Sequence, residues 1–378
     1  MHHSGTDDPN TASADGPPDG HGSSGPPPRR DFATTPLVVT WETSQACELA
    51  CDHCRADAKP DRDPAELDFD EAVSLFEQVA SFDPHPFLVL SGGDPLERPD
   101  IFELLSKAVD IGITPSITPA TTPNLDRETI ERFASIGVGR MALSLDGANA
   151  EEHDRFRGEP GTFAATMRAA KQANAAGVPI QFNTTVTART ANRLPDIADI
   201  VEQFGAAMWE VFFLVPVGRG AELEQLTPDR ARAVMEWLYD RGSAGRYRLI
   251  TVEAPFYRRV AREIADTDGR STAHVGSTGA GNGFVFVSHT GDVYPSGFMP
   301  ISAGNIREEP LPTIYRESEL LNRLRDRKSF DGPCGDCPAT EYCGGSRSRA
   351  YAATGNPYGS DPLCPWAANQ MAAGSSPP

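Results

Sequence analysis

Six short apolar runs alternate with amphipathic stretches between residues 37 and 239, and this alternation restricts the fold more than any other feature of the sequence. The runs cover residues 37–41, 87–90, 115–118, 140–145, 180–186 and 209–215, and the helical stretches that follow them are 67–82, 99–111, from 126, from 162, 195–204 and 229–239. Unbroken apolar runs are typical of strands covered on both faces, and repeats at this spacing require parallel strands with right-handed crossovers. Pro99 suits the first turn of its helix. The pattern predicts an α/β fold, either a doubly wound sheet or a partial barrel.

The charge balance disfavours two classes of protein. Aspartate and glutamate number 53 against 34 lysines and arginines, a formal net charge of −19, and a chain that binds nucleic acid depends on basic side chains for its phosphate contacts. The apolar run at residues 211–215 is far shorter than the ~20 residues that span a bilayer, so we expect no membrane partner. The lysines are only Lys59, Lys107, Lys171 and Lys328. This acidic, lysine-poor composition suggests a halophilic protein.

Seven cysteines fall into two groups, three near the start of the chain and four near its end. They are Cys47, Cys51 and Cys54, and then Cys334, Cys337, Cys343 and Cys364. Seven clustered cysteines do not make a disulfide framework for a chain of 378 residues. Residues 1–30 contain no apolar core of a signal peptide, so we expect a cytoplasmic protein whose cysteines bind metal.

The composition changes along the chain and predicts four regions. Residues 1–31 form an acidic tail rich in glycine and proline that we expect to be disordered, and residues 32–245 hold the strand–helix repeats. Residues 246–329 form a bridging region with a β-hairpin at 284–287 and 293–294. Residues 330–370 are rich in cysteine, glycine and proline, and such a segment needs a metal to stabilise it.

The first cysteine group has the spacing Cys47-x3-Cys51-x2-Cys54 and directly follows the first predicted strand. Three thiolates can bind three corners of a four-iron cluster and leave the fourth iron open. The alternative is a structural zinc site, which requires a fourth ligand. His53 is the only nearby candidate, and its position between two ligands gives it poor reach.

This spacing at the carboxyl end of a first strand resembles the radical S-adenosylmethionine (radical SAM) superfamily. The resemblance implies a (β/α)6 partial TIM barrel, with the active site at the carboxyl ends of the strands. It also implies a [4Fe–4S] cluster whose open iron binds S-adenosyl-L-methionine, and reductive cleavage that releases a 5′-deoxyadenosyl radical. The chain would then be an oxidoreductase or lyase.

Several strand ends carry residues that the resemblance assigns to S-adenosylmethionine. Ser91-Gly92-Gly93-Asp94-Pro95 is similar to the Gly-Gly-Glu-Pro motif that holds the methionine amine, with Asp94 in place of glutamate. The resemblance gives ribose contact to the polar residues after the fourth strand and adenine contact to the end of the sixth. The expected contacts are His53, Gly92, Gly93, Asp94, Pro95, Ser144, Asp146, Asn183 and Val215. Taken singly, each is also consistent with an ordinary turn or helix cap.

The second cysteine group supplies four thiolates, enough for one cluster without an open iron. A zinc ribbon is the alternative on spacing alone. The sequence Cys343-Gly-Gly-Ser346-Arg347 resembles the SPASM auxiliary-cluster region, and members that modify peptides carry further cysteines where this chain has Ser296 and Ser346. The resemblance therefore implies one auxiliary [4Fe–4S] cluster and is strongest for the haem-biosynthesis branch of the superfamily.

These resemblances imply oxidative decarboxylation of porphyrin propionates to vinyl groups. A tetracarboxylate substrate requires cations, and the candidates are Arg219, Arg258, Arg259, Arg347 and Arg349. The expected partners are a porphyrin or haem precursor and an electron donor such as ferredoxin or flavodoxin. Two alternatives stay open: a maturase that modifies a small ribosomal peptide, and a non-catalytic iron–sulfur scaffold.

Overall fold

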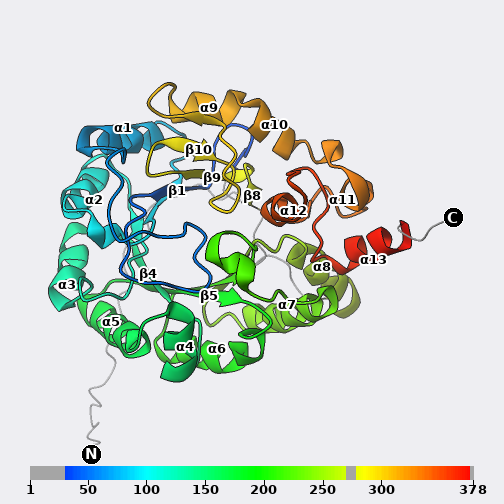
Figure 1. The fold of residues 1–378 in the computed structure, drawn as a ribbon, viewed down its shortest axis with the longest axis horizontal. Helices are drawn as coiled ribbons and strands as arrows, with labels where there is room; N and C mark the ends of the chain where they lie inside the picture. The colour runs from blue at the N-terminus through cyan, green and yellow to red at the C-terminus, as the bar shows by residue number, and fades with distance from the viewer. Residues whose placement is uncertain (1–29, 270–277, 375–378) are drawn as a thin grey trace, which may run out of the picture. The chain divides into compact units, whose positions relative to one another are not determined.

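Seven parallel strands in chain order form the centre of the computed structural model, which describes residues 30–269 and 278–374 (Figure 1). They are β1 (Val38–Glu42), β2 (Phe87–Ser91), β3 (Ser116–Ile117), β4 (Arg140–Ser144), β5 (Ile180–Val186), β6 (Met208–Phe213) and β7 (Arg248–Val252). Every neighbouring pair among them is parallel. The six predicted strands are confirmed, and β7 is a seventh that the periodicity did not predict. Residues 1–29 of the predicted tail lie outside the described residues.

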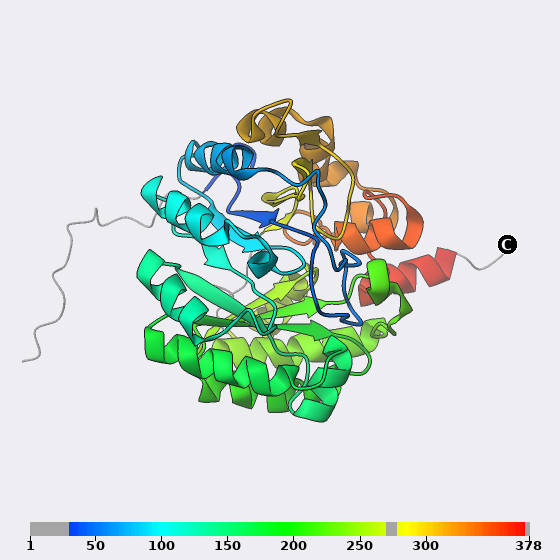
Figure 2. The ribbon, with the colours of Figure 1, turned by 60° about the vertical axis from the view of Figure 1, so that its left-hand side comes forward.

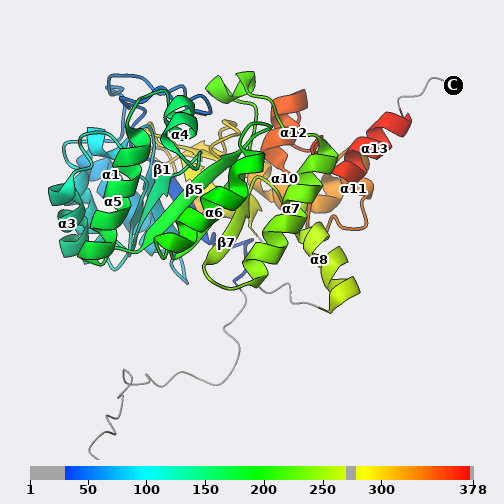
Figure 3. The same cartoon turned by 90° about the horizontal axis from the view of Figure 1, so that it is seen from below.

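Helices surround the strands on the outside, as a barrel-like α/β fold requires (Figures 1 and 3). The six predicted helices are α1 (Phe69–Ala80), α2 (Ile101–Asp110), α3 (Arg127–Ile136), α5 (Thr162–Ala176), α6 (Leu194–Gln203) and α7 (Pro228–Ser243). Their buried faces have helical spacing: α1 buries Ala72, Leu75, Phe76 and Val79, and Phe76 packs edge-on against Trp41 of β1 with ring centroids 5.7 Å apart.

Two details of the helices differ from the prediction. Pro99 lies just before Asp100, the N-cap of α2, and therefore outside the first turn. Helix α4 (Ala150–Arg157) between β4 and α5 was not predicted. Its buried face consists of His153, Phe156 and Arg157, which hydrophobic periodicity does not detect.

The predicted hairpin is confirmed and extends the sheet at its other edge. Its strands are β9 (Gly283–Val287) and β10 (Asp292–Tyr294), which pair antiparallel. Strand β9 also pairs parallel with β1, in the register Val39 with Val285. With β11 (Gly304–Asn305), the order is β11-β10-β9-β1-β2-β3-β4-β5-β6-β7, and the short β8 (Gly279–Ala280) pairs with β9. The turn between β9 and β10 thus lies beside the end of β1, where His289 Nδ1 is 2.9 Å from Glu42 Oε2.

The chain after β7 is mainly short helices. They are α8 (Tyr257–Asp268), α9 (Leu311–Glu317), α10 (Glu319–Arg325), α11 (Gly332–Asp336), α12 (Arg347–Thr354) and α13 (Pro365–Gly374). Helix α13 packs against α11 and α7, so the cysteine-rich segment lies against the barrel, and residues from 31 onward belong to one compact unit. Within the described residues, no helix is long and apolar enough to cross a membrane.

One buried arginine joins the cysteine-rich segment to two strands of the barrel. The side chain of Arg349 on α12 is fully buried and pairs with the fully buried Asp361 at 3.1 Å. It also donates hydrogen bonds to the carbonyls of Leu214 (3.2 Å) and Phe213 (3.3 Å) after β6, and to that of Glu253 (2.7 Å) after β7. The guanidinium therefore holds the ends of β6 and β7 and the second cysteine group in a fixed relation.

Replacing this arginine is expected to destabilise the fold strongly. Arg349→Met leaves the Asp361 carboxylate buried without its cation, and breaking such a pair costs about 3–5 kcal/mol of unfolding free energy. Arg127→Met is the control, because Arg127 pairs with Glu131 on the exposed face of α3 and should leave the unfolding curve almost unchanged. Anaerobic urea titrations of the reconstituted proteins measure both. Equal curves for the two variants would contradict the structural role of Arg349.

Candidate active site

A cavity of about 210 Å³ lies at the carboxyl ends of the central strands. In Figure 2 the strand arrows point toward the dark blue loop that follows β1 and carries the first three cysteines. Residues from the carboxyl-terminal parts of six successive strands and from the loops that follow them line the cavity. They are Cys47, Cys51, His53 and Cys54 after β1, Ser91, Gly92 and Gly93 at the end of β2, Thr118 after β3, Ser144 and Asp146 at the end of β4, Asn183 and Thr185 in β5, and Val215 after β6. The structure therefore brings together all but two of the residues expected to contact S-adenosylmethionine.

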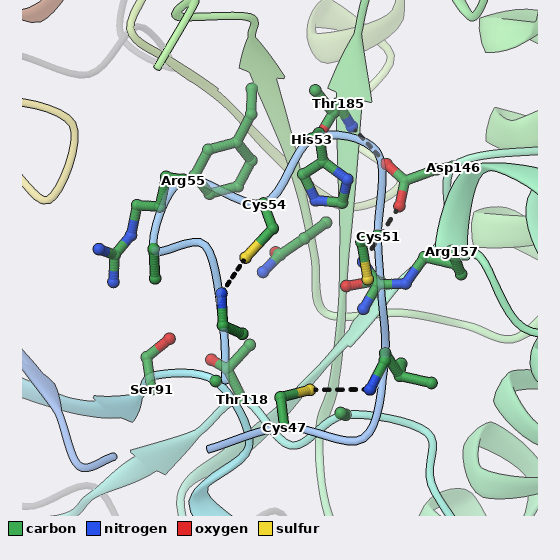
Figure 4. Close-up of a pocket in the computed structure, with 18 of the residues that line it drawn as sticks. Cys47, Cys51, His53, Cys54, Arg55, Ser91, Thr118, Asp146, Arg157 and Thr185 are labelled. Carbon is green, nitrogen blue, oxygen red and sulfur yellow. Dashed lines mark hydrogen bonds and ion pairs between the residues drawn. The ribbon is translucent and has the colours of Figure 1, made fainter. Parts of the chain in front are cut away.

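The three thiols of the first group border this cavity from one side (Figure 4). Backbone amides point at two of the sulfurs, with Leu49 N 3.4 Å from Cys47 Sγ and Ala58 N 3.5 Å from Cys54 Sγ. Burial raises the pKa of the Cys47 thiol to about 12 and also raises that of Cys51. Such thiols become thiolates when a metal replaces the proton, so the donor set fits an iron–sulfur cluster.

The thiols do not form a site for one metal ion. Within the described part of the chain, no three His, Cys, Asp or Glu side chains form a group that could hold a single ion. Structural zinc requires four ligands at about 2.0–2.3 Å from one centre, whereas the ligands of a four-iron cluster bind separate irons. The zinc alternative therefore gains no support from the geometry.

Gly92 and Gly93 let the end of β2 pack directly against the start of the cysteine loop. A Cβ atom on Gly92, whose φ is +144°, would lie 2.3 Å from the carbonyl oxygen of Ser44, and one on Gly93 would lie 2.2 Å from that of Ala46. The amide of Gly93 donates to the Ser44 carbonyl at 2.8 Å. The sequence indicated a close backbone approach here, and the structure shows that the partner is the loop backbone while both glycines also face the cavity.

Asp94 and Pro95 are the two expected contacts that do not line the cavity. The carboxylate of Asp94 is buried and accepts hydrogen bonds from Leu96 N (3.0 Å), Ala120 N (3.2 Å) and Thr122 Oγ1 (3.1 Å). Burial raises the pKa of Asp94 to about 6. Asp94 thus connects the end of β2 to the loop after β3 from behind the cavity wall.

Asp146 and Arg157 form a buried ion pair beside the thiols, with Nη1 of Arg157 3.5 Å from Oδ2 of Asp146 (Figure 4). Thr185 N donates to Oδ1 of Asp146 at 2.7 Å, while Oδ2 has no hydrogen-bond partner. Burial raises the pKa of Asp146 despite the nearby guanidinium. Burial disfavours the charged form of Arg157, but Cys51, Asp146 and Cys47 outweigh it and raise the arginine's pKa. Oδ2 of Asp146, which has no hydrogen-bond partner, can accept a hydroxyl of a bound ligand. The guanidinium of Arg157 can bind an anion.

Sequence reasoning missed Arg157 because α4 itself was not predicted. The sequence signal that could have indicated this helix end is Gly158, which directly follows Arg157. Gly158 has a φ of +74°, in the left-handed region, and is the C-cap of α4. A Cβ there would lie 2.7 Å from the carbonyl of Ala50 in the cysteine loop, so the glycine lets the end of α4 approach the loop. His53 on that loop stacks on Phe156 with ring centroids 4.8 Å apart, and burial holds the pKa of His53 well below its usual value.

The four cysteines of the second group line a separate small cavity with Arg259 and Trp366. Amides point at three of the sulfurs: Asp361 N at Cys334, Ala339 N at Cys337 and Gly345 N at Cys343, each at 3.4 Å. Burial raises the pKa of Cys343 to about 12 and that of Cys364 to about 11. Four thiols in one cavity, of which three are buried and three face amide donors, fit a second, fully thiolate-bound cluster.

The two serines that stand where other members carry cysteine meet at one carboxylate. Ser296 donates to Oε1 of Glu253 at 3.0 Å and Ser346 donates to its Oε2 at 2.5 Å, while Ser348 adds a third hydrogen bond at 2.8 Å. Glu253 follows β7 and has a φ of +53°. A hydrogen-bonded network therefore occupies the place where a further cluster would need thiolates.

Comparison with known proteins agrees with this geometry. The profile of the radical SAM superfamily matches residues 41–201, and that of the SPASM iron–sulfur cluster-binding domain matches residues 279–338. The AdoMet-dependent heme synthase of Methanosarcina barkeri is 38% identical over 88% of this chain and 97% of its own length. The enzyme of the same name from Nitratidesulfovibrio vulgaris is 36% identical over 92% and 97%. Mycofactocin maturase MftC of Mycobacterium ulcerans is 31% identical over 87% and 88%.

Among solved structures, Streptococcus suis SuiB matches with a TM-score of 0.68 and 18% identity over 88% of this chain and 77% of its own. This match supports the fold alone. A relative that is 38% identical and aligned over nearly its whole length supports the family. The chain therefore belongs to the radical SAM superfamily, as an enzyme with a [4Fe–4S] cluster that binds S-adenosylmethionine and a SPASM domain with an auxiliary iron–sulfur site.

Proposed function

We propose that this chain catalyses oxidative decarboxylation of porphyrin propionates to vinyl groups, on iron-coproporphyrin or a close relative. The observation that carries the proposal is the nearly full-length similarity to two enzymes named AdoMet-dependent heme synthase. The single four-thiol auxiliary site and the serines bound to Glu253 support it, because peptide-modifying members of the resembling group carry additional cysteines.

Residues of this chain would each have a distinct task around the cofactor. When bound, the cluster and S-adenosylmethionine supply a radical that removes hydrogen from the carbon β to a propionate carboxylate. Cys47, Cys51 and Cys54 hold the cluster. Arg157 binds the cofactor carboxylate, and Oδ2 of Asp146 accepts a ribose hydroxyl.

The remaining expected contacts serve the other parts of the cofactor. Gly92 and Gly93 present backbone to the methionine amine, and Ser144 and Asn183 lie on the same cavity wall as Asp146. Val215 and His53 contact adenine, with His53 supported from behind by Phe156. Asp94, with Pro95 beside it, acts indirectly by fixing the loop after β3.

The cavity size favours reaction of one propionate at a time. Its volume of about 210 Å³ also has to receive S-adenosylmethionine, itself of the size for which pockets measure ~300–1,000 Å³, so no room is left inside for a macrocycle. A macrocycle therefore stays at the mouth and directs one side chain inward. Successive propionates would each require a new S-adenosylmethionine, and a product with a single vinyl group should precede the final one.

The structure reduces the set of arginines available for substrate carboxylates. Arg347 and Arg349 are buried within the second cysteine segment, and Arg258 donates to the carbonyl of Tyr342 there. Arg219 lies nearer the first cavity, where it donates to the Cys51 carbonyl (2.9 Å) and pairs with Asp57 (3.1 Å). Arg259 lines the cavity of the second cysteine group, so of the five predicted candidates we retain Arg219.

A peptide maturase is the second candidate function. The 31% identity to MftC and the SuiB-like fold favour it, and a solved SuiB complex holds the precursor peptide SuiA. A non-catalytic scaffold is disfavoured, because the three thiols and the polar strand ends remain assembled around one cavity. We also propose that ferredoxin or flavodoxin supplies electrons, in the reducing cytoplasm of a halophilic cell.

Turnover of a porphyrin tests the proposed function directly. Reduced, reconstituted protein with S-adenosylmethionine should convert iron-coproporphyrin, and each converted propionate should lose the mass of CO2 plus two hydrogens. One 5′-deoxyadenosine should form per vinyl group, as measured by mass spectrometry and chromatography. Failure with every porphyrin, together with modification of a small peptide encoded nearby, would overturn the proposal in favour of the maturase.

Loss of the buried guanidinium beside the thiols should weaken cofactor binding. Arg157→Gln removes a charge-assisted hydrogen bond, worth about 1.5–3 kcal/mol, so the Kd for S-adenosylmethionine should rise roughly 10- to 150-fold by equilibrium dialysis. Arg155→Gln is the matched control on the same helix, where Arg155 is exposed and 4.0 Å from Glu151. Iron content should be the same in both. An unchanged Kd in Arg157→Gln would exclude a direct role in cofactor binding.

A further inference from the structure

Four arginines surround the second thiol site, although they come from distant parts of the sequence. They are Arg258 and Arg259 on α8, Arg327 after α10 and Arg347 at the start of α12, and we call them the arginine shell. Arg259 lines the cavity between the cysteines, and its Nε pairs with Glu263 at 2.7 Å. The other three, Arg258, Arg327 and Arg347, lie beside cysteine ligands or the loops that carry them.

Arg347 faces the ligand Cys334 from within the protein. It is only 4% exposed, donates to the carbonyls of Gly359 (2.6 Å) and Pro357 (3.3 Å), and lies over the ring of Phe330. Its Nη2 is buried without a hydrogen-bond partner. A Cβ atom on Gly345 would lie 2.8 Å from this nitrogen and 3.0 Å from Cys334 Sγ, so the glycine leaves an open gap between guanidinium and thiol.

Arg327 and Arg258 hold the loop that carries Cys343. Arg327 donates to the carbonyls of Glu341 (2.5 Å) and Thr340 (3.4 Å), and Arg258 donates to that of Tyr342 (3.1 Å). Burial lowers the pKa of Arg258 to about 10, while Cys343 acts in the opposite direction. Guanidinium groups stay protonated in proteins, so both place positive charge next to the loop that carries a cluster ligand.

The charges at the two thiol sites are balanced differently. At the first site each nearby arginine has a carboxylate partner: Arg157 pairs with Asp146 (3.5 Å), Arg219 with Asp57 (3.1 Å) and Arg55 with Glu42 (3.0 Å).

At the second site, neither Arg327 nor Arg347 forms an ion pair with a carboxylate of the described residues. The buried acid next to the ligands, Asp361, is already paired with Arg349. The second site therefore has an excess of positive charge that the first site lacks.

We propose that the arginine shell raises the reduction potential of the auxiliary cluster above that of the first cluster, so that the auxiliary site accepts the electron released by the substrate. Reduction adds one negative charge, and nearby cations and hydrogen bonds favour the more negative form.

This inference rests on the proposed decarboxylation. There, the carbon radical –CH•–CH2–COO− breaks its C–C bond and gives –CH=CH2, CO2 and one electron. That electron enters the oxidised auxiliary cluster and passes from it to the oxidised form of the proposed carrier, ferredoxin or flavodoxin. It equals in number the electron spent on cleaving S-adenosylmethionine, so turnover consumes no net electron.

The experiment measures the midpoint potential of the auxiliary cluster without any substrate. Full-length protein carrying Cys47→Ala, Cys51→Ala and Cys54→Ala is reconstituted anaerobically, so that only the second cluster gives an electron paramagnetic resonance signal during a redox titration. Arg327→Gln and Arg347→Gln are each expected to shift the reduced-to-oxidised ratio about tenfold toward the oxidised form, or about 59 mV for one electron.

Two further variants make the test decisive. Arg325→Gln is the matched control. Arg325 also donates to carbonyls, those of Gly281 (3.0 Å) and Tyr315 (2.6 Å), but it lines neither thiol cavity. The midpoint potential of the auxiliary cluster should therefore not change in this variant. Arg327→Lys keeps the charge, so its midpoint potential should stay close to that of the protein with Arg327. Arg327 is only half-buried, so its variants test the inference even if Arg347→Gln does not fold.

The inference would be overturned if Arg327→Gln and Arg347→Gln gave the same auxiliary-cluster midpoint potential as Arg325→Gln, at equal iron and sulfide content. A shift in Arg327→Lys as large as that in Arg327→Gln would also overturn it. Absence of porphyrin turnover with the predicted potentials would instead reject the proposed substrate and leave the electrostatic role of the shell intact.

Discussion

The buried ion pair between Arg349 and Asp361 is the interaction on which both thiol sites depend. Its guanidinium donates to carbonyls after β6 and β7, including that of Leu214, which lines the first cavity. Asp361 in turn accepts from the amide of Ser346 at 2.8 Å, and its own amide points at Cys334 Sγ. Buried, hydrogen-bonded side chains therefore set the position of the two sites relative to each other.

Features encoded by neighbouring residues were predictable from the sequence. Apolar runs predict the strands. The spacing of the cysteines predicts the two thiol sites, because ligands of one cluster lie close together in the sequence. The boundaries of β5 match the predicted run. Features that depend on the completed fold were not predictable: α4 buries His153 and Arg157 rather than aliphatic side chains, and only one of the five residues of β7 is buried.

The same limit applies to the candidate site. Gly92 and Gly93 signalled a close backbone approach, but the sequence does not show that the partner is the cysteine loop. Asp94 follows them in the motif, yet its carboxylate turns toward Ala120 and Thr122 behind the wall. The arginine shell combines the neighbours Arg258 and Arg259 with Arg327 and Arg347, which follow about 70 and 90 positions later, so on sequence alone each member resembles an ordinary surface cation.

The scarcity of lysine has a structural consequence inside the protein. A buried lysine tends to lose its proton, whereas the delocalised guanidinium stays charged and offers several donors in a fixed plane. The cations buried at functional positions here, Arg157, Arg347 and Arg349, are all arginines. An acidic exterior thus coexists with a positively charged second thiol site. An arginine-rich chain can therefore carry a net charge of −19 and still surround anionic clusters with permanent positive charge.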